Sequence, residues 1–222
     1  MRRQLRNLFY RATLGDHAYR FLFEPGPMDE VVVLDCETTG LNPRIDEVIA
    51  VAAVMIRSSR IMTSEAYTAI IKPDRVLTPT SIKVHRLRAR DVAEGRPMHE
   101  VLPELLRFIG GRPIVGYYVD FDVRMLDRYV LRYIEAKLPN RRIEVSEIYY
   151  ALKYGGAPPG TVLDLRFQSI LADLGIPNFG QHDAFNDALM TAMMYVQLRD
   201  MRQRGVRIGR ERAVQQEAPI GA

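Results

Sequence analysis

Two acidic side chains at the end of an apolar run could together bind a metal ion. Asp35 and Glu37 follow the run 31–34 directly, and Gly40 ends the segment. Side chains two apart on a strand point to the same face, so both carboxylates would lie side by side at its C-terminal end. Two such charges repel by roughly 4 kcal/mol at about 4 Å with an effective dielectric near 20. A divalent cation, which prefers hard oxygen ligands, would offset this repulsion.

Two later segments add further acids. Asp122 falls in the first turn of a predicted helix, where the helix dipole alone would favour an acid, and Asp120 is the better N-cap by position. Asp187 lies inside a long predicted helix. Its neighbours at helical spacing are small, namely Ala184, Ala188 and Thr191. A solvated helix face more often carries long polar side chains, so this spacing predicts that Asp187 faces a closely packed neighbour.

Two histidines and one cysteine lie near these acids. His182 precedes the last helix, for which Asp183 is the natural N-cap, and is predicted to lie in a loop over the site. His85 follows a short helical turn and could approach the site from outside or serve in packing. Cys36 should point away from Asp35 and Glu37, as a buried core residue. A single cysteine permits no intramolecular disulfide, which fits a reducing cytoplasm.

The apolar pattern predicts an α/β fold with a mixed central β-sheet flanked by α-helices. Strands are expected at residues 31–34, 48–56, 67–71 and 114–117, with a turn at 57–60. Helices are expected around residues 81–84, 98–109, 122–136, 145–153, 165–174 and 183–201. The C-terminal half is therefore predicted to be helical only.

Length and composition fit one globular core with short appendages. The chain has 222 residues, of which 47% are hydrophobic. A Pro- and Gly-rich cluster at 24–27 predicts a basic N-terminal arm over 1–28, a main domain over 29–204 and a basic, loosely ordered tail over 205–222. The longest charge-free apolar run, 48–56, is too short to cross a bilayer, so no membrane partner is expected.

The charge distribution leaves two interpretations open. The net charge is +4, and the excess of arginine lies in the two tails. Such an excess is typical of nucleic-acid binding and also of ordinary solvated termini. The amphipathic, acid-poor start of the chain also has the pattern of a mitochondrial transit peptide, although serines are absent there.

Taken together, these segments resemble the three motifs of the DEDDh 3′-to-5′ exonucleases, the family that contains the epsilon proofreading subunit of bacterial DNA polymerase III. The resemblance covers residues 31–195 and depends on the order and intervals of the motifs. The matching residues are Asp35, Glu37, Thr38, Thr39 and Gly40, then Phe121 and Asp122, then His182 and Asp187.

The resemblance implies an RNase H-like fold and release of nucleoside 5′-monophosphates from a single-stranded or frayed 3′ end, with DNA favoured. Four acids would bind two Mg²⁺ or Mn²⁺ ions, namely Asp35, Glu37, Asp122 and Asp187. His182 would be the general base. The remaining candidates would contact the substrate, the aromatic ones by base stacking: Thr38, Thr39, Gly40, His85, Tyr117, Tyr118 and Phe121. A DNA polymerase is an implied partner.

The chain also departs from the family pattern at two places. Tyr117 and Tyr118 stand where many polymerase-associated members carry His-Asn, and Arg86 follows His85 where glycine is common. The C-terminal tail contains no convincing clamp-binding peptide. These differences concern how the terminal nucleotide is held and leave the five catalytic positions intact.

Other functions explain less of the sequence. A haloacid-dehalogenase-type phosphatase has Asp where this chain has Glu37, and would leave His182 and Asp187 without a role. An RNase H endonuclease takes its second carboxylate from a later helix. Two alternatives stay open: an RNA-directed exoribonuclease of the same family, and a catalytically silent nucleic-acid-binding adaptor on the same fold.

Overall fold

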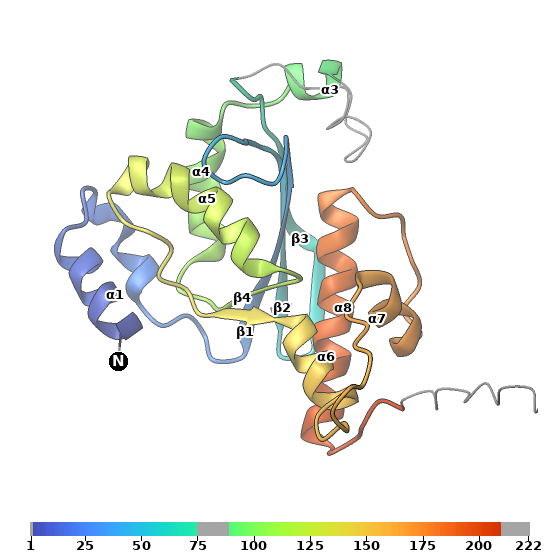
Figure 1. Cartoon of the computed structure of the whole chain (residues 1–222). Helices are drawn as coiled ribbons and strands as arrows, with labels where there is room; N and C mark the ends of the chain where they lie inside the picture. Colours follow the sequence, from blue (N-terminus) through green and yellow to red (C-terminus); the bar gives the residue numbers. More distant parts are fainter. Residues whose placement is uncertain (1, 75–88, 210–222) are drawn as a thin grey trace, which may run out of the picture.

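The computed structural model describes residues 2–74 and 89–209, and within them five strands form one mixed sheet (Figure 1). The strand order is β3-β2-β1-β4-β5. The β1–β2 and β2–β3 pairs are antiparallel, and the β1–β4 and β4–β5 pairs are parallel. The strands are β1 (Glu30–Thr38), β2 (Val48–Arg57), β3 (Arg60–Ile70), β4 (Ile114–Gly116) and β5 (Arg142–Glu144).

Helices cover both faces of this sheet. One face packs against the helices α4 and α5 and the 3-10 helix η1, and the other packs against α6, α7 and α8. The helical elements are α1 (Arg2–Ala12), η1 (His17–Phe23), α3 (Ala89–Ala93), α4 (Met98–Ile109), α5 (Val119–Ile134), α6 (Val145–Lys153), α7 (Phe167–Leu174) and α8 (Ala184–Gln203). The predicted mixed sheet flanked by helices is therefore confirmed.

Strand β1 lies in the middle of the sheet and is buried on both faces. Val32 and Leu34 contribute to the core on the α4–α5 side, whereas Val31 and Val33 contribute to the core on the α8 side. A central strand covered on both faces needs apolar residues at successive positions, which explains the unbroken run before Asp35.

Three details of the prediction were wrong. The C-terminal half is not helical only, because β5 pairs with β4; this strand has only three half-buried residues, too few for a visible pattern. Helix α5 begins at Val119 rather than 122, and its N-cap is Tyr118 rather than Asp120. Asp120 instead pairs with Arg142 at 2.8 Å. The predicted helix around 81–84 lies outside the described residues.

The segment before β1 contributes to the main core. Leu14, Tyr19 and Leu22 are buried with the α4–α5 side of the sheet, and the Gly15 N–H donates to the Ile134 carbonyl at 3.1 Å. The domain boundaries at 28 and 204 stay predictions. No helix in the described part of the chain is long and apolar enough to span a membrane.

Candidate active site

The end of β1 projects beyond its parallel neighbour, and α5 fills the space that remains. Strand β4 pairs with β1 only at Val32 and Val33, and it ends at Gly116. The Cys36 N–H therefore has no partner on β4. Asp122 in the first turn of α5 supplies one, because its Oδ1 accepts the Cys36 N–H at 3.1 Å. This bond holds the second motif directly against the first.

Helix α8 brings the third motif to the same place. Its small residues Ala184, Ala188 and Thr191 are buried, as predicted, and the helix packs on β1 and β2. Asp183 is the N-cap and accepts the Asn186 N–H at 2.9 Å, which confirms that prediction.

His182 lies in the loop just before this cap, as its sequence position predicted. Its backbone has a φ of 68°, a region that non-glycine residues rarely adopt. Its N–H donates to Asp187 Oδ2 at 2.9 Å. A strained residue held by a site carboxylate is typical of functional positions.

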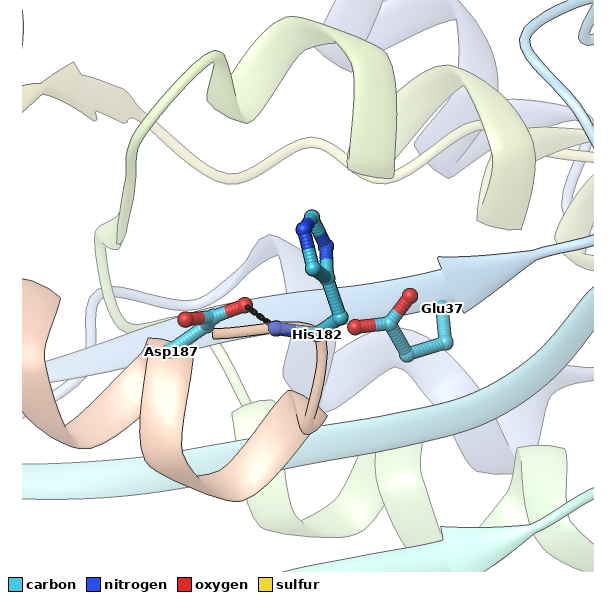
Figure 2. A group of neighbouring side chains, drawn as sticks. All are labelled: Glu37, His182 and Asp187. Carbon is cyan, nitrogen blue, oxygen red and sulfur yellow. Dashed lines mark hydrogen bonds between the residues drawn. The ribbon is translucent and has the colours of Figure 1, made fainter. Parts of the chain in front are cut away.

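Three potential metal ligands converge from these elements (Figure 2). Glu37 comes from β1, His182 from the loop and Asp187 from α8, and each offers one ligand atom within 4.8 Å of the others. Asp187 Oδ1 is buried and has no hydrogen-bond partner. An unpartnered buried carboxylate oxygen beside a second carboxylate and an imidazole fits a divalent cation.

Asp35 and Asp122 lie beside this group, although they do not belong to the three that converge most closely. Burial raises the pKa of Asp35 well above its usual value, and the nearby charges of Asp122, Asp187 and Glu37 raise it further. Burial also raises the pKa of Asp122, against the opposing effect of the Cys36 N–H. The structure therefore brings all four predicted acids into one electrostatic cluster.

The pKa values of the other two acids in the cluster are raised as well. The pKa of Glu37 rises to about 7 through burial and the charges of Asp187 and Asp183. Burial raises the pKa of Asp187, while the His182 N–H opposes that change. Among the described residues, no lysine or arginine forms an ion pair with these carboxylates. The crowded negative charge is left for a cation to neutralise.

Of the predicted substrate residues, Thr38 is the last residue of β1, and Thr39 and Gly40 follow directly after the strand. The Thr38 hydroxyl donates to the Gly40 carbonyl at 2.8 Å, and the Thr39 hydroxyl donates to Asp46 Oδ1 at 3.2 Å. A Cβ at Gly40 would lie 2.6 Å from the Asp46 carboxylate, so a larger residue there would displace Asp46 from its hydrogen bonds with Thr39 and Asn42. These side chains shape the loop beside Glu37, and their contact with substrate stays a prediction.

The three predicted stacking residues differ in exposure. The Tyr117 hydroxyl donates to the Leu165 carbonyl at 3.0 Å, and its ring packs edge-on against Phe167. Phe121 packs against the core. Tyr118 is 63% exposed with a φ of 56°, so among these three it offers the most accessible ring for a base. His85 lies outside the described residues.

Glu144 is a structural partner that sequence reasoning missed. Its Oε2 accepts the Val119 N–H at 3.0 Å, and its Oε1 accepts the Ser146 N–H at 3.1 Å. One carboxylate thus serves the first turns of both α5 and α6, and its charge helps to raise the pKa of Asp122. An acid directly before the predicted helix 145–153 was the available signal.

A cleft of about 1020 Å³ opens beside the cluster. Glu37 and His182 line it, together with Phe179 of the loop before α8 and Phe185 of α8 itself. The sheet side consists of small residues of β2 and β3, such as Ala52 and Ala66. A concave surface beside a group of perturbed acids is the usual location of an active site.

Known proteins are similar to this chain in sequence and in fold. The chain is 30% identical over 200 residues to the PolC-type DNA polymerase III of Thermotoga maritima, a match that covers 89% of this chain and 13% of that protein. It is 27% identical over 168 residues to the DNA polymerase III epsilon subunit of Aquifex aeolicus, covering 75% of this chain and 79% of that subunit. The chain thus spans about an eighth of the PolC-type relatives it matches.

Among solved structures, the zinc-bound complex of Escherichia coli exonuclease I with single-stranded DNA has the same fold, with a TM-score of 0.67 at 19% identity. The match covers 80% of this chain and 42% of that one, and it identifies the sheet and its helices as RNase H-like. A family model of the RNase T type, described as an exonuclease, matches residues 32–195. Because this match covers more than half of the chain, the protein belongs to that exonuclease family.

Proposed function

We propose that this chain is a 3′-5′ exonuclease that depends on divalent metal ions and releases nucleoside 5′-monophosphates. The convergence of acids from β1, α5 and α8 beside His182 is the observation that supports this function best. Four carboxylates without a basic partner are expensive to fold together unless a cation binds among them. Membership of the exonuclease family agrees with this chemistry.

Four residues would hold the metal ions: Asp35, Glu37, Asp122 and Asp187. The unpartnered Oδ1 of Asp187 and the absence of a basic neighbour in the described cluster support this ligand set. We propose two ions, Mg²⁺ or Mn²⁺. When bound, they would lower the pKa of a water molecule and stabilise negative charge at the scissile phosphate. Four negative charges match two divalent cations, so the loaded site would be close to neutral.

His182 would act as the general base. A neutral imidazole can take a proton from the attacking water, whose oxygen then bonds to the terminal phosphorus. The bond from phosphorus to the 3′ oxygen breaks, that oxygen takes a proton from solvent water to become the new 3′ hydroxyl, and His182 returns its own proton to solvent. The bond from the His182 N–H to Asp187 would keep the imidazole above the acid cluster.

We propose DNA as the substrate, because relatives with a matching sequence are named as parts of DNA polymerase III. Association with a DNA polymerase is proposed on the same basis. RNA is the alternative substrate, since the choice depends on contacts to the 2′ hydroxyl. A cytoplasmic location stays a prediction.

A digestion of matched oligonucleotides tests this function. The substrates are 5′-labelled single-stranded DNA and RNA of one sequence, incubated with Mg²⁺, with Mn²⁺ or with EDTA. We expect a ladder that shortens one nucleotide at a time from the 3′ end, for DNA and only with metal. A ladder for RNA alone would change the substrate. No cleavage of either would contradict the activity and favour the binding adaptor.

A further inference from the structure

Helix α5 carries a row of three arginines, of which the first and last are exposed and the middle one is half-buried. Arg124, Arg128 and Arg132 follow one another at four-residue intervals, so they lie on one face with steps of about 6 Å. The row begins one turn after Phe121, the neighbour of Asp122. This arginine row therefore leads away from the acid cluster along the helix that positions one of its members.

The charge of the arginine row is poorly compensated. In the described part of the chain, its one ion pair joins Arg124 to Asp120 at 3.9 Å, and Asp120 lies closer to Arg142, at 2.8 Å. Positive charges four residues apart on a helix repel each other and weaken the helix. An exposed helix face ordinarily mixes both signs of charge, so an uninterrupted row is suited to a polyanion.

Arg128 is held in place before any ligand arrives. Its guanidinium lies 5.0 Å from the centre of the Tyr129 ring and donates to the Tyr129 hydroxyl at 3.1 Å, while its Nε is buried without a partner. The same hydroxyl accepts the Val48 N–H at 3.4 Å, and Val48 is the β2 partner of Thr38. The middle of the row is thus anchored to the end of the sheet that carries the catalytic candidates.

A cavity of about 290 Å³ lies beside the far end of the row. Its aromatic and charged lining residues include Tyr129, Tyr133, Lys72, Arg132, Glu47 and Asp74. Tyr133 is 41% exposed. A basic side chain next to an accessible aromatic ring, as Arg132 and Tyr133 are at this cavity, is typical of grooves that follow a single nucleic-acid strand.

We propose that the arginine row binds the phosphodiester backbone of the substrate strand, a few nucleotides before its 3′ end. The inference rests on the proposed exonuclease function, and α5 lies within reach of a strand bound at the acid cluster because its Asp122 contacts β1 there. Arginine suits this role because its planar guanidinium bonds two phosphate oxygens at once. The row sets the affinity for long strands and takes no part in the bond cleavage.

Two variants with equal net charge test the proposal. The row variant carries R124Q, R128Q and R132Q, and the control variant carries R60Q, R202Q and R204Q. Each lowers the net charge from +4 to +1. The control positions are exposed and lie at the β2–β3 turn and the end of α8, far from the catalytic end of the sheet. Glutamine has nearly the helix propensity of arginine, so the substitutions within α5 and α8 keep the preference of these segments for helix.

Each protein is assayed on a single-stranded DNA of about 20 nucleotides and on the p-nitrophenyl ester of thymidine 5′-monophosphate, which has no upstream phosphate. For the row variant we expect KM on the long strand to rise at least about tenfold. The slope of log KM against log salt should fall by about 2, since each single-strand phosphate contact contributes about 0.7. Its kcat on the ester should stay within about twofold, as should every parameter of the control variant.

Two results would overturn the proposal: an unchanged KM and salt slope in the row variant, or an equal loss in the control variant. If the wild-type chain cleaves neither substrate, the proposed function fails instead. The row is then tested by the fluorescence anisotropy of a labelled strand in EDTA. Binding that weakens only in the row variant would support strand binding by the arginine row, and equal binding by all three proteins would refute it.

Discussion

The backbone N–H of Cys36 donates to Asp122 Oδ1 across 3.1 Å, although 86 residues separate them in the chain. The bond exists because β4 ends before it reaches this part of β1 and leaves the Cys36 N–H to α5. Asp35 and Glu37, on either side of Cys36, are thereby set against a third carboxylate. The geometry of the acid cluster thus follows from where one short strand stops.

Replacing Asp35 should abolish metal-dependent hydrolysis. Asp35→Asn keeps the shape of the side chain but removes a charge at the centre of the cluster, where Asp122, Asp187 and Glu37 all act on it. The measurement is the rate of nucleotide release with Mg²⁺. Cys36→Ala is the matched control, since this neighbour points into the opposite core. Full activity of the Asp35 variant would remove it from the metal site.

His182→Ala should slow turnover by roughly 10²–10⁴, the usual contribution of a general base. Its affinity for Mn²⁺, measured by calorimetry, should change little. A large loss of Mn²⁺ affinity would instead make His182 a ligand, as its position within 4.8 Å of Glu37 and Asp187 allows. The exposed His17 provides a control substitution without effect on rate.

The metal-free protein should lose stability as the pH rises from about 5 to 8. The folded-state pKa of Glu37 is raised to about 7. A carboxyl whose pKa is raised by folding contributes stability below its unfolded pKa and loses it as the pH passes through the folded value. Glu37→Gln should flatten this decline and raise Tm at pH 8 by roughly 5–10 °C, measured in EDTA. If Tm of this variant depended on pH as Tm of the wild type does, the raised pKa of Glu37 would be contradicted.

A divalent metal ion should restore the stability that the metal-free protein loses as its crowded carboxylates become charged. Millimolar Mg²⁺ or Mn²⁺ should raise Tm, because the ion binds the folded cluster and not the unfolded chain. The increase should be larger at pH 8 than at pH 5.5, where protons compete for the carboxylates. Thermal unfolding with and without EDTA measures it, and Asp187→Asn provides the comparison. Equal melting temperatures under all four conditions would count against a metal site.

Glu144→Ala should destabilise the fold, because the buried Val119 and Ser146 N–H groups lose their acceptor. Each unsatisfied donor costs about 1–3 kcal/mol. Urea unfolding measures the loss, and Glu147→Ala, which replaces an exposed acid in the first turn of α6, should change stability by less than about 0.5 kcal/mol. Similar values for both variants would show that Glu144 is an ordinary surface residue.

Most of the correct predictions about strands, helices and caps came from local sequence patterns. The apolar run before Asp35, the small residues around Asp187 and the Asp183 cap each depend on neighbours within one strand or one helical turn. The order of three such segments carried the resemblance to the exonuclease family, and that resemblance implied the RNase H-like fold and the five polar positions that the structure brings near one another.

Contacts between distant segments could not be predicted. The helix start at Val119 depends on Tyr118 with a φ of 56° and on an acceptor from Glu144, 25 residues away. Strand β5 owes its existence to β4 rather than to its own composition. Such features become visible only when the sheet has brought the segments together.

The most direct measurement of the central claim is anomalous diffraction from crystals soaked in Mn²⁺. The account predicts two Mn²⁺ peaks among Asp35, Glu37, Asp122 and Asp187, with His182 beside them and outside the ligand set. Crystals without manganese density at this cluster, or with the carboxylates paired to lysine or arginine, would contradict it.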